Sequence, residues 1–376
     1  MPARLVAASL LLAALAVPAH ARWTVIGGGE LWPEDPVAGH GVAIVSWEGE
    51  AWLAGGRPWV EYNTDTLRVG IADLKLGERL LAGVTLTGEY AISGLLIDHF
   101  VEGENQRERG FYASHVEGEV WLKHLYPVGA WAEVSVTGRR WFFERSDETD
   151  RALVLPPETW VVQPRVRLGL WRLRSLDAHG GRRLFMRLDG WAAGVEGGAE
   201  VRGEARRWGA IGPAFVAPDD RNDPAAVIPQ ARQWALLGVP VGARARVEVE
   251  ERAGIGFGED DLSRVRFGGM SPYVVPIPGA PWAGWLSETF VSGRVAVPVD
   301  VGGGVELAPT VAAAWLLDPT RAGRDEMGTV WGAGATAQWW SGPWQVDVRG
   351  GVSPTLWAAR DAVAWSAWIS AGWSQP

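Results

Sequence analysis

The chain of 376 residues contains no cysteine, and beyond its N-terminus it has no run of about 20 apolar residues long enough for a transmembrane helix. The lack of cysteine excludes disulfides, thiolate metal sites and a lipidated N-terminal cysteine. No phosphate-binding loop and no Gly-x-Ser-x-Gly turn occurs. The formal net charge is −9, and the arginines are not clustered, so we do not expect a nucleic-acid partner.

The first 21 residues have the features of a secretory signal peptide. Arg4 supplies a positive charge, residues 5–17 form an apolar stretch, and Ala19-His20-Ala21 fits a cleavage site. We therefore expect residues 1–21 to be removed during export. Residues 22–40 are expected to form a short periplasmic segment.

Residues 41–373 repeat one pattern, in which about ten residues alternate between apolar and polar before a turn. Ala-Glu-Val-Arg-Gly-Glu-Ala-Arg at 199–206 and Ala-Arg-Ala-Arg-Val-Glu-Val-Glu at 243–250 are examples. The 24 tryptophans suit membrane interfaces, and the 49 glycines suit closely packed strands and turns. The pattern predicts an all-β protein, a transmembrane antiparallel β-barrel of about 16 strands, with lipid outside and a polar lumen. A soluble, tryptophan-rich sugar-binding protein is the alternative.

The connections between the last five predicted strands alternate in length. Gly302-Gly303-Gly304 and Ser341-Gly342-Pro343 are tight turns, whereas residues 318–328 and 354–361 form longer connections. Outer-membrane barrels have short periplasmic turns and longer external loops. We therefore expect both termini in the periplasm of a bacterium, and lipid and lipopolysaccharide of its outer membrane as partners.

Residues 254–285 interrupt the alternation and contain Val265-Arg266-Phe267-Gly268-Gly269. Five predicted strands follow them, among them 291–299 and 329–340. This arrangement resembles the C-terminal barrel of the bacterial surface antigen superfamily, the BamA and TamA type. In that family a long external loop with a Val-Arg-Gly-Phe/Tyr motif precedes five strands. Here Phe and Gly are exchanged after the arginine, and no counterpart of the family's POTRA repeats is recognised.

The resemblance implies that the loop, about 255–284, folds toward the lumen and that Arg266 docks on the inner wall. A buried guanidinium needs carboxylate partners. The candidates on polar faces are Glu248, Glu250, Glu288 and Asp347. The resemblance also implies a role in membrane protein assembly or translocation, with other outer-membrane proteins as partners. No catalytic residue, metal or cofactor is expected.

Two other functions fit the sequence. A porin-like diffusion channel would use the long loop to narrow its pore. An outer-membrane hydrolase would need a site at the rim, and His99, beside Asp98 and Glu102, is its one candidate.

The sequence allows two roles for each of two groups of charged residues. Rows such as Arg165 and Arg167 either pair with glutamates across strands or line an anion-selective channel. The loop acids Glu259-Asp260-Asp261 are expected to be solvated, with Ca²⁺ binding as the alternative.

Overall fold

The computed structural model describes residues 22–374 with twelve gaps. The gaps are 34–37, 65, 90–94, 98–99, 102–103, 106, 176–187, 211–220, 270–273, 281–283, 318–326 and 356–363. The predicted signal peptide and His99 therefore lie outside the described residues. Within these ranges, no helix has both the length and the apolar character needed to cross a membrane.

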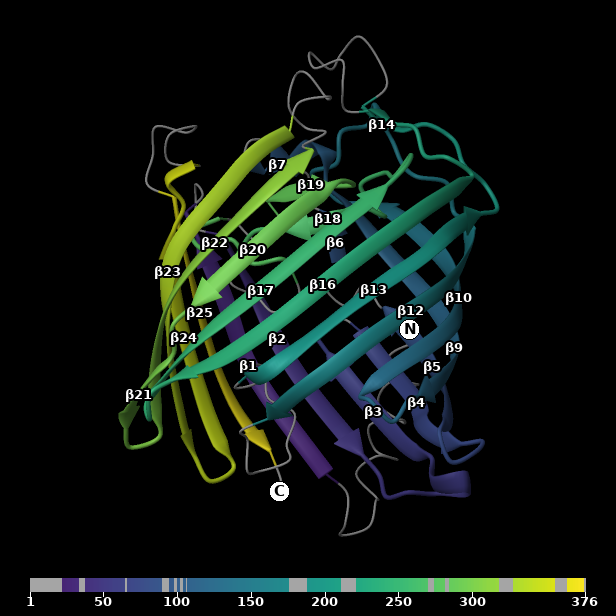
Figure 1. The fold of residues 1–376 in the computed structure, drawn as a ribbon. Coiled ribbons are helices and arrows are strands. Elements are labelled where there is room, and N and C mark those ends of the chain that lie inside the picture. The colour runs from purple at the N-terminus through teal and green to yellow at the C-terminus, as the bar shows by residue number, and fades with distance from the viewer. Residues whose placement is uncertain are drawn as a thin grey trace.

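Sixteen antiparallel strands form a closed barrel (Figure 1), and β1 pairs with both β2 and the last strand, β25. The sheet contains 18 named strands, but β6 continues β5 and β21 continues β20, which leaves 16. This confirms the predicted fold class. The wall strands are β1 (Arg22–Trp32), β2 (Ala38–Glu48), β3 (Arg57–Asn63), β4 (Thr66–Lys75), β5 (Leu80–Glu89), β6 (Leu95–Ile97), β9 (Phe111–Leu125), β10 (Ala130–Arg145), β12 (Trp160–Ser175), β13 (Leu188–Arg202), β16 (Val227–Val241), β17 (Ala245–Gly256), β20 (Phe290–Ala296), β21 (Val299–Gly302), β22 (Val305–Leu317), β23 (Met327–Ser341), β24 (Trp344–Val352) and β25 (Trp365–Ser374).

The remaining short strands are not part of the wall sheet, and they form three small sheets of their own. β7 (Phe100–Val101) pairs with β8 (Glu104–Asn105), β14 (Trp208–Ala210) lies between β11 (Leu153–Val154) and β15 (Arg221–Asn222), and β18 (Val265–Phe267) pairs with β19 (Trp285–Ser287). Two single turns of 3-10 helix are η1 (Leu53–Gly55) and η2 (Arg107–Arg109).

The two faces of the wall differ as the alternation predicts. On β9, Val116 and Val120 are 55% and 57% exposed on the outer face. On the inner face, Lys123 lies 2.7 Å from Glu133 of β10, and Arg139 of β10 bonds Glu117 of β9. Because apolar side chains point outward around the barrel and ion pairs lie inside, the outer surface matches the hydrocarbon of a bilayer.

Both chain ends of the wall lie at one rim, because Thr24 of β1 pairs with Ser374 of β25. The same rim carries the tight turns β16–β17, β21–β22 and β23–β24 (Figure 1). It is the lower rim as drawn. The expected periplasmic location of this rim stays a prediction from turn length.

Three stretches of the wall differ from the expectations. Residues 22–40, expected to be a periplasmic segment, instead contain β1 and the start of β2. The expectation was wrong because Gly27-Gly28-Gly29 hides the alternation of β1. The sequence indicates strand over residues 59–71 with uncertain breaks, and the structure forms the β3–β4 hairpin there, which turns at Thr64 with a φ of 49°. The strand β16 was not expected, and Pro229 and Pro240 interrupt its pattern.

Candidate functional site

The connection between β17 and β20, residues 257–289, is a folded unit that we call the lumen loop. Its strands β18 and β19 pair in antiparallel register, with Phe267 opposite Trp285. Single bridges join Phe267 to Val275 and Gly269 to Ile277. Gly268 and Gly269 have φ values of 118° and 75°, which allow the chain to turn sharply after β18.

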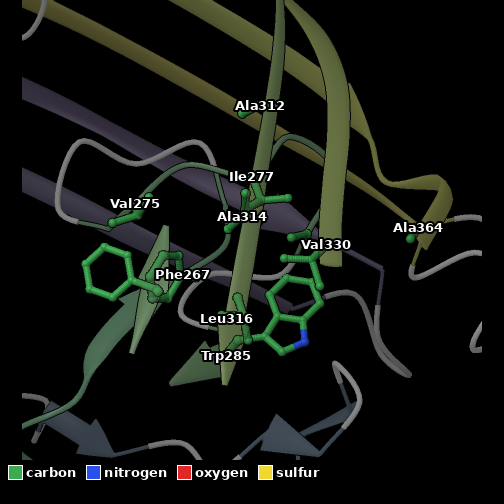
Figure 2. Close-up of a cluster of buried hydrophobic side chains, with 11 residues drawn as sticks. Phe267, Val275, Ile277, Trp285, Ala312, Ala314, Leu316, Val330 and Ala364 are labelled. Carbon is green, nitrogen blue, oxygen red and sulfur yellow. The ribbon is translucent and has the colours of Figure 1, made fainter. Parts of the chain in front are cut away.

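The lumen loop packs against the inner face of the wall. On β22, Val311 and Trp315 are exposed on the outer face, whereas Ala312, Ala314 and Leu316, which alternate with them, are buried. These three belong to one apolar cluster with Phe267 and Ile277 of the loop (Figure 2). The loop therefore lies inside the barrel, as predicted from the break in alternation.

Phe267 is the main apolar anchor of the loop. It is fully buried, and its ring lies 4.8 Å from that of Phe290 on β20, edge to face. Full burial of such a side chain contributes roughly 1.5–3 kcal/mol. Small alanines on β22 leave room for it, and Figure 2 shows Phe267 beside the strand that carries them.

A buried ion pair fixes the first part of the loop to β13. Arg202 donates from Nη1 and Nη2 to the two carboxylate oxygens of Asp260, at 2.7 and 2.8 Å. Asp260 also accepts from Trp208 Nε1 at 2.9 Å, and Arg202 Nε donates to Glu200 at 2.6 Å. Both carboxylate oxygens of Asp260 therefore accept hydrogen bonds, and the guanidinium of Arg202 neutralises its negative charge.

The neighbouring acids of the loop are also buried. Asp261 accepts from Asn222 Nδ2 and donates its own N–H to Asn222 Oδ1, each at 3.0 Å. Burial raises the pKa of Glu259 to about 8, and repulsion from Glu288 adds to the shift, whereas Arg232 and Arg264 oppose it. The expectation that Glu259-Asp260-Asp261 would be solvated is therefore wrong: all three are buried, and Asp260 and Asp261 anchor the loop.

The middle of the loop lies flush against β23 and β24. A Cβ at Gly332 would lie 1.8 Å from the carbonyl oxygen of Pro278, and one at Gly351 would lie 2.4 Å from Pro278 Cβ. The N–H of Gly279 donates to Ser366 Oγ of β25 at 3.0 Å. Only glycine at these wall positions leaves space for the backbone of the loop to come so close.

The loop also reaches β1, on the far side of the lumen from β13. A Cβ at Gly269 would lie 2.7 Å from Oε1 of Glu30, which is fully buried on the inner face of β1. In the order of the closed wall β1 is the first strand and β13 the ninth of 16, so the two stand opposite each other. The lumen loop therefore spans the barrel.

The predicted docking motif lies within this unit. Val265 and Arg266 are half-buried on β18, and Phe267, Gly268 and Gly269 are buried. The carboxylate that binds Arg266 stays a prediction.

The four predicted partner carboxylates have the following bonds. Glu248 accepts from Arg246 Nε at 2.6 Å, and Glu250 accepts from Arg294 Nε at 3.2 Å. Glu288 accepts the N–H of Glu259 at 3.2 Å. Asp347 accepts from Gln338 and Arg349, both at 2.8 Å.

Three residues of the loop contacts were not predicted from the sequence, namely Arg202, Glu30 and Pro278. Arg202 lies in an ordinary alternating strand, and its partner Asp260 is 58 residues away. Pro278 contacts glycines that are also ordinary for a barrel strand. The one available signal was the break in alternation, which locates the loop but not its contacts.

The charged rows of the lumen wall are paired where they are described. Arg167 bonds Glu196 at 2.6 Å and Glu133 at 2.7 Å. Arg246 makes a bidentate pair with Glu306 at 2.5 and 2.7 Å. These pairs favour cross-strand neutralisation over an anion-selective lining.

Comparison with known proteins identifies the fold. No family model and no curated protein matches the chain. BamA of Haemophilus ducreyi lacking POTRA domains 1–3 matches with a TM-score of 0.59 and 10% identity, over 94% of this chain and 70% of that one. CdiB of Escherichia coli matches with a TM-score of 0.60 and 13% identity, over 96% and 64%. CdiB of Acinetobacter baumannii matches with a TM-score of 0.54 and 8% identity, over 94% and 60%.

These similarities show that the chain has the β-barrel fold of BamA and CdiB. The chain spans between 60% and 70% of the length of those structures. The predicted resemblance of its barrel to the BamA type is confirmed at the level of the fold.

Proposed function

We propose that the protein is a plugged outer-membrane barrel that acts in the assembly or translocation of other outer-membrane proteins. The observation that supports this most is the lumen loop, which contacts β13, β23, β24 and β1 from inside. A barrel crossed by a folded and anchored segment is poorly suited to free diffusion of solutes. The relatives with this fold, BamA and CdiB, support a task that concerns proteins rather than small solutes.

The anchors of the loop support a plug that is held in place but can be released. The contact at β13 is ionic, and the contacts at β23 and β24 are made by backbone and small side chains. Neither is covalent, since the chain has no cysteine. A partner chain that displaced the loop would open the lumen.

Conductance across planar bilayers separates this proposal from a porin. The wild-type protein should give rare and unstable openings. A variant in which residues 258–284 are replaced by a short linker should give a steady pore of larger conductance. A steady open pore in the wild type would favour the porin-like channel instead.

The role in assembly has its own test. Vesicles that contain the purified protein should speed the folding of an added client barrel, compared with empty vesicles and with vesicles that hold a porin. Equal rates in all three would rule out the assembly role and leave translocation.

A further inference from the structure

Two polar side chains lie on the outer face of the wall, near the middle of two neighbouring strands. Gln233 is near the centre of the 15-residue strand β16, and Glu251 is near the centre of the 12-residue strand β17. The Nε2 atom of Gln233 donates to Oε1 of Glu251 at 3.3 Å. Both strands cross the near side of the barrel in Figure 1. The pair therefore lies within the band of the wall that hydrocarbon covers.

The alternation of both strands assigns the pair to the outer face. Glu251 lies between Glu250 and Arg252, and these two bond each other at 2.6 Å on the lumen side. Because successive residues of a strand point to opposite faces, Glu251 points away from the lumen. On β16, Gln233 lies opposite Val195 of β13, which is exposed on the outer face. Both side chains therefore face lipid.

The outer face around the pair is apolar. Leu237 of β16 and Ile255 of β17 lie on the same face, below and above the pair, and both are exposed. On the flanking strands this face carries only apolar residues and glycine, from Trp191 to Val201 of β13 and from Val291 to Val295 of β20. A polar or charged side chain on the lipid face destabilises a barrel. Its presence at this depth indicates that something other than lipid covers it.

Small residues surround the pair and leave room for a close approach. Gln233 lies opposite Ala253, and Glu251 lies opposite Ala235. On its other side Glu251 lies opposite Gly293 of β20. Transmembrane helices associate through small residues that allow close packing and polar side chains that hydrogen-bond across the contact. A strand face in lipid is subject to the same physics, and this face has both features.

The hydrogen-bonding groups of the pair are complementary to themselves. The amide of Gln233 has two N–H donors, and its bond to Glu251 uses one of them. The carboxyl of Glu251 has two oxygens, and one of them accepts this bond. A two-fold axis along the membrane normal, between the two residues, sets each Gln233 opposite the Glu251 of a second copy. The rotation keeps every residue at its depth, so the second N–H of each amide meets the second oxygen of the facing carboxyl.

We propose that the outer face of β16 and β17 is a surface for self-association, where two copies of the chain pair side by side in the membrane. Gln233 and Glu251 of the two copies form a closed ring of hydrogen bonds, and the small residues around them exclude lipid from it. Two-fold contacts of this kind are the commonest in homo-oligomers. The surface is separate from the lumen loop and from the seam of β1 with β25. The inference therefore does not depend on the proposed role in assembly or translocation.

The absence of cysteine makes the contact directly testable. The variant Ala253→Cys, reconstituted in liposomes at low protein density, should form a disulfide-linked dimer on mild oxidation. The matched control is Ala367→Cys on β25, because Ala367 lies on the outer face opposite the exposed Leu31 of β1. At this control position, crosslinking should stay at the level of random collisions.

Two further changes in the Ala253→Cys background separate hydrogen bonding from apolar contact. Gln233→Leu combined with Glu251→Leu should raise the dissociation constant of the dimer about tenfold, because the bonds across the contact are lost. The heat resistance of the barrel on semi-native gels should not fall, since both new side chains suit lipid. Glu251→Gln keeps a polar group that can pair with the facing amide, so it should retain the dimer.

Three results would overturn the proposal. The first is no dimer at residue 253, or equal crosslinking at residues 253 and 367, which means that the copies meet only by collision. The second is undiminished crosslinking in the double leucine variant, which means apolar association alone. The third is crosslinking of Ala253→Cys to a different protein in native membranes, without a dimer of the chain itself, which assigns the surface to another partner.

Discussion

The lumen loop is held by charge at β13 and by shape at β23 and β24. At β13, Asp260 and Arg202 form a bidentate pair, and substitution of one residue leaves the other buried charge without this partner. At β23 and β24, Pro278 lies against Gly332 and Gly351, where the contact depends on the lack of a side chain. The first contact fixes orientation and can be exchanged for another charged partner. The second tolerates no added atom but offers little specific attraction.

The largest effect is expected from Asp260→Ala. The substitution leaves the buried Arg202 with Glu200 as its acceptor and removes the partner of Trp208 Nε1. Loss of one member of a buried ion pair costs about 3–5 kcal/mol. The variant should unfold at lower temperature on semi-native gels and open more often in bilayers.

Asp223→Ala is the matched control for the charged contact. Asp223 bonds Arg207 at 2.8 Å, but both side chains are more than half exposed. Such pairs contribute about 0–1 kcal/mol. Equal losses of heat resistance for the two variants would mean that the Asp260 pair does not hold the loop.

The shape contact is tested by Gly332→Ala. The new methyl group would overlap the carbonyl of Pro278, so the loop or β23 must move. Overpacking of this kind costs about 1–3 kcal/mol. Gly350→Ala on β24 is the control, because a Cβ there has no neighbour within 4 Å. Thermal melting followed by circular dichroism should separate the two variants, and coincident melting curves would contradict the close contact.

A smaller effect is expected from Arg266→Ala. Arg266 is half-buried on β18, so water partly screens the predicted docking contact. Loss of this contact should cost about 1–2 kcal/mol. The heat resistance of the barrel on semi-native gels should fall, whereas Arg206→Ala, in an exposed pair, should leave it unchanged. An unchanged gel shift for Arg266→Ala would count against the predicted docking role.

The strands that follow the lumen loop were predictable, and the contacts of the loop were not. From β20 to β25 the alternation is regular and the turns are glycine-rich, so period and turn chemistry agree. The first strand, β1, was missed because three consecutive glycines carry no pattern. The strand β16 was missed because Pro229 and Pro240, which lie on opposite faces of it, break its alternation, and such a break resembles a loop.

The failure at the acidic loop residues has a different cause. Nothing in Glu259-Asp260-Asp261 distinguishes a solvated turn from a buried anchor, because the arginine that neutralises Asp260 lies in a distant strand. Periodicity reports which face of a strand a residue occupies. It does not report which residue meets it across a closed lumen.

The smallest effect on the charged contact is expected at Glu259, because the charge of this residue changes with pH and needs no substitution. Its Oε2 is buried with no hydrogen-bond partner among the described residues, and its pKa is raised to about 8 from an ordinary value of 4.5. Between these two values the docked loop binds more protons than a released loop. The stability of docking is therefore greatest below about pH 4.5, falls as the pH rises toward 8, and is level above it.

Glu259→Gln is neutral at every pH, so it should match the wild type at pH 5 and be more stable at pH 9. Glu204→Gln, in an exposed loop, should keep the pH dependence of the wild type. Melting temperatures measured from pH 5 to pH 9 for the three proteins decide the matter, and a Glu259→Gln curve parallel to the wild type would mean that this carboxyl is already charged in the docked loop.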